Sequence, residues 1–258
     1  MNTKNCNTYH KLPILDGLEL LNAKNHTTNF PFHTLDTFNV ALIFNQTFNV
    51  KLVDRFLQAP VGTLSITNPH EVHATPCDNK IGNSFFTFYI SPEILKDLND
   101  GNDVFFENKT IYDEELFKTL YHLSVNLNKT NVHFEKTLLL AINKLVKRYS
   151  QPDVFRTRET SLFKRFIEEE TFKKFSLTDT ANNFGINKYK FLRLFKQETG
   201  LTPNAFVISK RIEKCKRLLQ TESDLLEIAI ETGFYDATHL CRYFKRFTGV
   251  TPYEYKRA

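Results

Sequence analysis

The sequence predicts an α+β protein of two domains, with a β-barrel in the N-terminal half and an all-α C-terminal half. Up to about residue 110, short runs rich in Phe and Val alternate in part between apolar and polar positions and are separated by turn residues. Beyond about residue 150, apolar residues recur with helical spacing instead, and one run of residues occurs twice. We therefore expect one domain in residues 1–152 and a second in residues 153–258.

The expected barrel rests on four stretches between residues 37 and 90. These are TFNVALIF, TFNVKLVDRFL, APVGTLSITNPHEVHATP and NSFFTFYI. The third contains a short strand between turn signals of Pro, Gly and Asn, and the other three are rich in Phe or Val. Several short strands with turns between them are typical of a sandwich or a barrel.

A helix pair is expected between residues 113 and 150. The first helix starts with acidic residues, and the second places Leu138, Ile142, Leu145 and Tyr149 on one face. The second helix carries more apolar surface than one packing face needs. Two interpretations stay open, and both can hold: the pair closes the end of the barrel, or it forms the seam of a homodimer. The polar stretch at 150–159 then predicts a linker.

The composition favours a globular protein with one basic end. Hydrophobic residues make up 41% of the chain and charged residues 24%, which is a globular balance. The formal net charge is +5, and it divides into +6 for residues 153–258 and −1 for residues 1–152. A basic half joined to a near-neutral half indicates that one end meets a polyanion.

The sequence shows neither a signal peptide nor a membrane span, and its cysteines form no motif. The N-terminal residues lack the apolar core of a signal peptide, and no stretch approaches the length of a membrane span. These features predict a cytoplasmic protein with no membrane contact. The four Cys residues share no short spacing, which argues against a zinc knuckle or a redox pair.

The repeat predicts two copies of a small helical unit. RLFKQETGLTP begins at Arg193 and RYFKRFTGVTP at Arg242, and an Ala and a Gly upstream of each run recur as well. In each copy a helix with apolar i, i+4 positions leads through a Gly turn into a second, basic helix, and Gly permits the sharp turn. This pattern predicts helix-turn-helix units at about 176–197 and 225–247, joined by a long helix opened by Pro203. The second helix of such a unit can lie in the major groove of DNA.

Each second helix divides into an inner and an outer face. Phe191 and Phe195 in the first copy, and Leu240 and Phe244 in the second, are expected to point inward. The outer residues, which we expect to contact DNA, are Lys188, Tyr189, Leu192, Arg193, Lys196, Ala237, Thr238, Cys241, Arg242 and Lys245. Arg can form two hydrogen bonds with guanine, and Thr can touch a thymine methyl group. Any one of these Arg residues alone would be read as an ordinary surface charge, but two at matching places favour base contact.

The run Thr-Gly-x-Thr-Pro after each second helix predicts how the helices end and begin. Gly200 and Gly249 are expected as C-caps, and Thr202 and Thr251 as N-caps near phosphates. Two such units in one chain can occupy successive major grooves, roughly 34 Å apart, on one face of the duplex.

Residues 160–258 resemble the DNA-binding domain of the AraC/XylS family of bacterial transcription regulators throughout. The most telling run is DLLEIAIETGFYDATHLCRYFKRFTGVTPYEYKR. The resemblance implies two helix-turn-helix units joined by a long helix. The positions that it implies for base contact are Tyr189, Arg193, Ala237, Thr238, Cys241 and Arg242. Leu192 and Ala237 replace polar residues common in relatives, which favours the reading of methyl groups and DNA shape.

Residues 10–110 resemble, less closely, the sensor domain of many AraC-type regulators, a small cupin-like barrel. The runs FPFHTLDTFNVALIF and APVGTLSITNPHEVHATP carry this likeness. In the family the barrel holds an effector and the helices after it form the dimer. We assign effector contacts in this chain to His33, Phe44, His73 and Phe86.

Cupins also raise the alternative of a metal-dependent enzyme. His33 lacks the second, closely spaced His of metal-binding cupins, while NPHEVHA supplies His70, Glu71 and His73. On an alternating strand Glu71 and His73 share a face and His70 points elsewhere. The set is incomplete and no nucleophile and base pair is visible, so we expect no metal, no cofactor and no enzymatic activity.

The sequence therefore predicts an effector-responsive, sequence-specific transcription regulator, and an activator, as most relatives are. The expected partners are double-stranded DNA, a small-molecule effector, RNA polymerase and a second copy of the chain bound through residues 113–150. Two alternatives remain: a non-sensing regulator gated by a protein partner, and a metal-dependent cupin enzyme fused to a DNA-binding domain.

Overall fold

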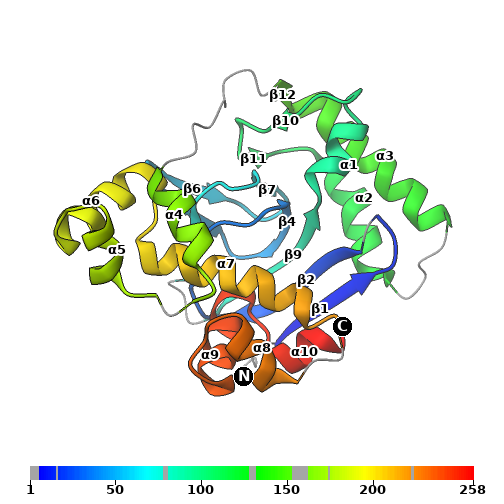
Figure 1. Ribbon diagram of the computed structural model, residues 1–258. Coiled ribbons are helices and arrows are strands. Elements are labelled where there is room, and N and C mark those ends of the chain that lie inside the picture. Colours follow the sequence, from blue (N-terminus) through cyan, green and yellow to red (C-terminus); the bar gives the residue numbers. More distant parts are fainter. Residues whose placement is uncertain are drawn as a thin grey trace.

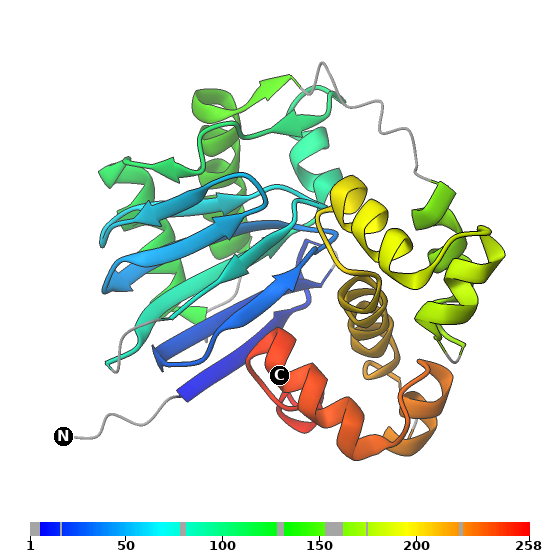
Figure 2. The same cartoon turned by 90° about the vertical axis from the view of Figure 1, so that its left-hand side faces the viewer.

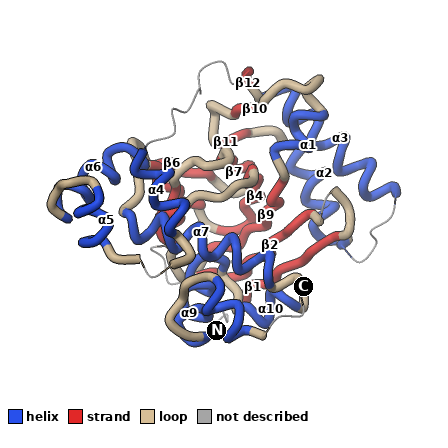
Figure 3. Tube along the Cα trace, viewed as in Figure 1, coloured by secondary structure: helices blue, strands red, loops and turns tan. Residues whose placement is uncertain are grey.

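The computed structural model of the chain has a β-rich N-terminal domain and a helical C-terminal domain (Figure 1; Figure 3). It describes residues 6–15, 17–77, 81–127, 132–152, 162–173, 175–221 and 224–258. The two-domain α+β prediction is confirmed at this level. Most of the expected linker at 150–159 lies outside the described residues.

The strands of the N-terminal domain form separate antiparallel sheets. The larger sheet has the order β1 (Cys6–Leu12), β2 (Leu18–His26), β9 (Asn83–Ile90), β4 (Phe38–Asn45), β7 (Leu64–Thr67) and β11 (Thr110–Ile111). The smaller sheet has the order β3 (Phe30–His33), β8 (His73–Thr75), β5 (Phe48–Leu52) and β6 (Phe56–Ala59). A short ladder joins β10 (Val104–Phe105) to β12 (Gln151–Pro152).

The described strands therefore do not form the expected closed barrel. β1 and β11 are the two edges of the larger sheet, and they do not pair with each other or with the smaller sheet. The stretch 59–76 supplies β7 to the larger sheet and β8 to the smaller one. The chain turns between them at His70, whose φ of 60° is left-handed.

The larger sheet is buried on both faces because its strands alternate between two cores. On β9, Phe86 and Phe88 belong to one core, and Phe85 belongs to the other. The first core is closed by α1 (Pro92–Asp97), α2 (Glu114–Val125) and α3 (Val132–Tyr149). The expected helix pair thus covers a face of the sheet rather than the end of a barrel (Figure 1). Its apolar side chains share one core with Phe86 and Phe88.

The C-terminal domain contains the repeat as two helix pairs on the two sides of one long helix (Figures 1 and 2). The helices are α4 (Leu162–Glu170), α5 (Leu177–Asn183), α6 (Lys188–Thr199), α7 (Pro203–Leu218), α8 (Leu225–Glu231), α9 (Ala237–Thr248) and α10 (Pro252–Lys256). Pair α5–α6 and pair α8–α9 are the expected helix-turn-helix units, and α7 is the connecting helix.

The expected caps are confirmed. Gly200 and Gly249 end α6 and α9 with left-handed φ angles of 78° and 82°. The Thr202 hydroxyl accepts a hydrogen bond from the backbone of Ala205, and Thr251 forms a full capping box at the start of α10.

The two domains share a continuous apolar core. Ile208 and Ile212 on α7 and Phe244 on α9 belong to the same buried cluster as Phe48 and Val50 of the smaller sheet. Such a shared core fixes the position of the C-terminal domain on the N-terminal domain, because separating them would expose these side chains to water.

Both C-cap glycines lie at this interface. A Cβ atom added to Gly200 would lie 2.6 Å from Val53 Cγ2, and one added to Gly249 would lie 2.8 Å from Asn7 Nδ2. Asn7 Nδ2 also donates a 2.9 Å hydrogen bond to the carbonyl of Gly249. The N-terminal domain therefore contacts the same turn in both copies of the repeat.

Among the described residues, no helix is both long enough and apolar enough to cross a lipid bilayer.

Candidate DNA-binding surface and interdomain cavity

The second helix of each unit presents the outer face that the sequence predicts. Phe191 and Phe195 of α6 are fully buried, as are Leu240 and Phe244 of α9. The ten residues expected to contact DNA are exposed or half-buried: Lys188, Tyr189, Leu192, Arg193, Lys196, Ala237, Thr238, Cys241, Arg242 and Lys245. The inner side chains hold each helix to its unit, which leaves the outer ones available to a ligand.

The outer face of α9 has an ordered Arg side chain with a surface groove beside it. Arg242 lies with its guanidinium 5.5 Å from the ring centre of Tyr243, a cation–π distance that steadies the long side chain. A shallow groove beside it is lined by Tyr235, Asp236, Thr238, His239 and Arg242. The Asp236 side chain accepts a hydrogen bond from the His239 backbone and caps α9, so it is occupied in holding the helix start.

A basic groove adjoins the start of α7. It is lined by Lys51, Lys196 and Arg246, together with the N-cap Thr202 and the next turn. Three cations beside the amides of a helix start favour a phosphate group. Lys51 belongs to the N-terminal domain, so this groove spans both domains.

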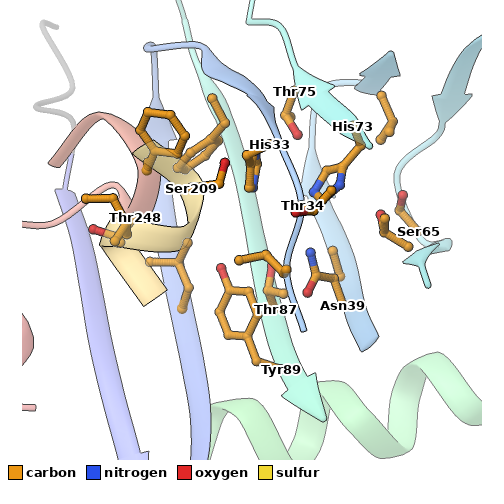
Figure 4. A pocket seen from close by; sticks show the side chains of 18 of the residues that line it. His33, Thr34, Asn39, Ser65, His73, Thr75, Thr87, Tyr89, Ser209 and Thr248 are labelled. Carbon is orange, nitrogen blue, oxygen red and sulfur yellow. The ribbon is translucent and has the colours of Figure 1, made fainter. Parts of the chain in front are cut away.

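A second feature is an interior cavity of about 60 Å³ between the two domains (Figure 4). One wall is formed by strands of both sheets, which contribute His33, His73, Thr75 and Thr87 among other residues. The opposite wall is formed by α7 and by the end of α9, which contribute Ser209, Ile212, Glu213, Lys216, Phe247 and Thr248. Anything bound there would contact the N-terminal domain and helices α7 and α9 together.

His33 and His73 lie side by side in this cavity. They are directly opposite each other on β3 and β8, and their ring centres are 4.4 Å apart. Burial lowers the pKa of His33 to about 3, aided by the neighbouring imidazole of His73, and burial also lowers the pKa of His73. Both imidazoles are therefore neutral at pH 7.

A buried polar cluster closes the end of the cavity. Lys216 Nζ lies 3.3 Å from Glu19 Oε2 and 3.8 Å from Glu213 Oε1. Glu19 also accepts hydrogen bonds from the hydroxyls of Tyr9, at 2.7 Å, and Tyr255. Glu19 is on β2 and Lys216 is on α7, so this pair ties the two domains together.

The pKa values of this cluster favour the charged pair. Burial alone would raise the pKa of Glu19, but the charge of Lys216 and the hydrogen bonds from Tyr255, Tyr9 and Lys216 outweigh it and lower that pKa. Burial alone would lower the pKa of Lys216, but Glu19 and Glu213 raise it well above its usual value. Glu213 differs, because burial is the larger effect and raises its pKa.

Of the four residues assigned to the effector, the structure brings two together. His33 and His73 line the cavity. Phe44 and Phe86 lie on the other face of the larger sheet, where Phe44 packs edge-on against Phe117 and Tyr121 of α2. A one-residue step along a strand reverses the side-chain direction, which is why Phe85 borders the cavity and Phe86 does not.

The metal alternative finds no support in the positions of its residues. Glu71 pairs with Lys109 at 2.9 Å, and His70 lies 3.2 Å from Asp36. Within the described part of the chain, no group of three or more His, Cys, Asp or Glu side chains is placed to hold a metal ion.

The residues that α7 contributes to the cavity were not among those expected from the sequence. Ser209, Glu213 and Lys216 follow one another at helical spacings of four and three, so they form one polar stripe on a helix that is otherwise apolar toward the core. That stripe was visible in the sequence, but α7 was interpreted only as a connection between the two units.

Comparison with known proteins agrees with this architecture. Residues 180–258 match the sequence profile of a helix-turn-helix domain. The chain is 25% identical over 237 residues to YbfI, an uncharacterised HTH-type transcriptional regulator of Bacillus subtilis, with 86% of each protein covered. It is 36% identical over 93 residues to the TetD protein of transposon Tn10 from Escherichia coli, covering 36% of this chain and 67% of TetD.

Other relatives match over shorter stretches, and the chain spans between 24% and 55% of their lengths. In fold, the chain is similar to an apo variant of ToxT from Vibrio cholerae, with a TM-score of 0.58 and 14% identity over 99% of this chain and 98% of ToxT. The paired helix-turn-helix units and these matches lead to one conclusion: the chain belongs to the AraC/XylS family of DNA-binding transcription regulators.

Proposed function

We propose that the chain is an effector-responsive activator in which the interdomain cavity is the effector site. The observation that carries this proposal is the composition of the cavity wall. Most of it comes from the β-rich domain, and the rest comes from α7, the helix that connects the two helix-turn-helix units, and from the end of α9. A ligand that fills it changes the contacts between the domains directly, with no relay through intervening residues.

The fold comparison supports this assignment. ToxT has also been solved with an unsaturated fatty acid bound. A regulator of the same architecture thus accepts a small organic molecule. We accordingly take residues 1–152 as the effector-binding and dimerisation domain and residues 153–258 as the DNA-binding domain. The pairing of β12 with β10 keeps the chain within the first domain up to residue 152.

We assign DNA reading to the outer faces of α6 and α9. The two units flank α7, so one chain offers two recognition helices that can enter successive major grooves. Arg193 and Arg242 occupy matching places and are exposed. The basic groove of Lys51, Lys196 and Arg246 suits the phosphate backbone between the two contact points.

The test is a selection of bound sequences from a random duplex library with the full chain. Wild type should select an asymmetric site with two motifs about one helical turn, roughly 10 base pairs, apart. Arg242→Ala should weaken binding by about 1–3 kcal/mol and relax one base pair in one motif, and Arg193→Ala should do the same in the other motif. Arg217→Ala is the matched control, since Arg217 is an exposed Arg at the end of α7, outside both recognition faces. Selection of the same site by Arg242→Ala and wild type would refute the placement of α9.

We also propose that the helix pair of residues 113–150 mediates the homodimer, with α3 at its centre, and that the activator contacts RNA polymerase. Leu140 is 54% exposed and borders a surface groove with Leu98, Val132 and Leu139. Apolar side chains gathered in one exposed groove favour contact with a second copy.

A further inference from the structure

The cavity histidines have a fixed hydrogen-bonding direction. His33 Nδ1 lies 2.7 Å from the carbonyl oxygen of Pro31, and His73 Nδ1 lies 2.9 Å from the carbonyl oxygen of Glu71. A carbonyl can only accept a hydrogen bond, so both Nδ1 atoms carry the proton. Each neutral ring therefore has its lone pair on Nε2, and both rings are turned into the cavity (Figure 4). Neither Nε2 has a hydrogen-bond partner among the described residues.

Ser209 adds an unpartnered hydroxyl from the opposite wall. Its side chain is buried on α7, and its Oγ atom is the one buried side-chain polar atom of the described residues that lacks a hydrogen-bond partner. Other buried hydroxyls on helices donate to a carbonyl of the preceding turn, as Ser124 does to Tyr121 at 2.7 Å and Thr248 to Phe244 at 2.8 Å. Leaving such a group unpaired costs free energy, so a ligand that forms a hydrogen bond with Ser209 Oγ would recover that free energy on binding.

The charges in the cavity disfavour an anion. Lys216 is the only Lys or Arg on the walls formed by the described residues, and its ammonium group is already committed to Glu19 and Glu213. Glu213 adds a carboxyl group, and the two histidines add lone pairs. A ligand carboxylate would find acceptors facing it and no free cation, whereas a ligand rich in hydroxyl groups would find partners for its protons.

The strand wall adds further hydroxyl groups. Thr75 and Thr87 line the cavity, and their hydroxyls can exchange hydrogen bonds with a polyol.

We propose that the interdomain cavity binds a small uncharged polyol, whose hydroxyls donate to Nε2 of His33 and of His73 and pair with Ser209 Oγ. This inference rests on the proposed function, in which the cavity is the effector site. Ser209 is the contact from the DNA-binding domain, so it couples occupancy of the cavity to the position of α7.

The test uses the full chain, because α7 and α9 form one wall of the cavity. The probes are glycerol and erythritol, with sorbitol as a larger polyol and a sixteen-carbon unsaturated fatty acid as the anionic comparison. Binding is measured by titration calorimetry, and the melting temperature of the ligand-free protein is recorded for each variant. The variants are Ser209→Ala and the matched control Ser124→Ala, a buried helical serine outside the cavity whose hydroxyl is already paired.

We expect saturable binding of erythritol or glycerol that is about fivefold weaker in Ser209→Ala and unchanged in Ser124→Ala. We also expect opposite effects on the ligand-free protein. Ser209→Ala should raise the melting temperature by about 2–4 °C, since it removes an unpaired hydroxyl, and Ser124→Ala should lower it. A purely structural role for Ser209 would not produce a more stable protein that binds ligand less well.

Two results would overturn the inference, and only one of them would also count against the cavity as the effector site. Ser209-dependent binding of the fatty acid, without polyol binding, would show that the ligand class is wrong while the cavity remains an effector site. If no probe binds although the protein still selects its DNA site, the polyol assignment fails, and the effector role of the cavity loses its support with it.

Discussion

The Glu19–Lys216 pair should contribute measurably to the docking of the two domains. The two charged atoms are 3.3 Å apart, and the side chains are 19% and 10% exposed. At that separation and an effective dielectric constant near 20, the Coulomb attraction is about 5 kcal/mol. Part of it is offset by the cost of removing both charges from water, so we expect a coupling energy of about 2–4 kcal/mol between the two positions.

A double-mutant cycle measures this coupling. Lys216→Met leaves the Glu19 carboxylate without its cation, and it should destabilise the protein by about 3–5 kcal/mol. Glu19→Gln leaves Lys216 with only the more distant Glu213, at 3.8 Å, and should cost somewhat less. The double variant should lose much less than the sum. Urea unfolding can be followed by tyrosine fluorescence, because the chain has 10 Tyr and no Trp. Tyr9, whose ring centre is 4.8 Å from that of Tyr255, reports on this cluster.

The control is a cycle on Lys96 and Asp103, a pair 3.0 Å apart whose side chains are 49% and 72% exposed. It should show no resolvable coupling, because exposed ion pairs are screened by water. If the Glu19–Lys216 cycle also shows no coupling energy, the pair does not hold the domains together, and the interface depends on its apolar core alone.

Two further predictions concern the buried histidines and α3. Burial lowers the pKa of His33 to about 3 and that of His26 to about 4. As the pH falls below 6.5, these two imidazoles therefore take up protons in the unfolded chain before they do so in the folded chain. Their contribution to stability is complete above pH 6.5 and is lost toward pH 4, at about 1.4 kcal/mol per pH unit for each His. His33→Gln should flatten the pH dependence of unfolding, and an unchanged profile would contradict the burial of this ring. Leu140→Lys should convert a dimer to a monomer in sedimentation equilibrium, with the matched exposed change Tyr112→Lys leaving the dimer intact; an undisturbed dimer in Leu140→Lys would place the seam elsewhere.

The C-terminal half could be predicted from sequence because its signals are local. Caps such as Thr202, turn glycines such as Gly200 and the inward Phe residues of α6 act within one or two turns of helix, so a repeat of residues implies a repeat of structure. The likeness between the two units then indicated which residues face outward, and the burial of Phe191 and Phe195 agrees with it.

The cavity could not be predicted to the same degree because its residues are joined only by the tertiary fold. His33 and His73 come together through pairing of β3 with β8, and Ser209 reaches them through docking of the other domain. Strands outside the four expected stretches escaped notice because their own residues give a weak signal. β1, for example, is an edge strand rich in polar residues and shows no clear apolar alternation.

The contacts at Gly200 and Gly249 affect the spacing that the protein accepts between its two DNA motifs. The N-terminal domain touches the same turn at the end of each recognition helix, so it supports both helices at equivalent points. With α7 between them, the distance between the two helices is fixed by contacts along the whole chain. Loosening either contact would let the two helices move relative to each other. The length of operator that the protein tolerates is therefore a property of the interface between its domains as much as of the residues that touch the bases.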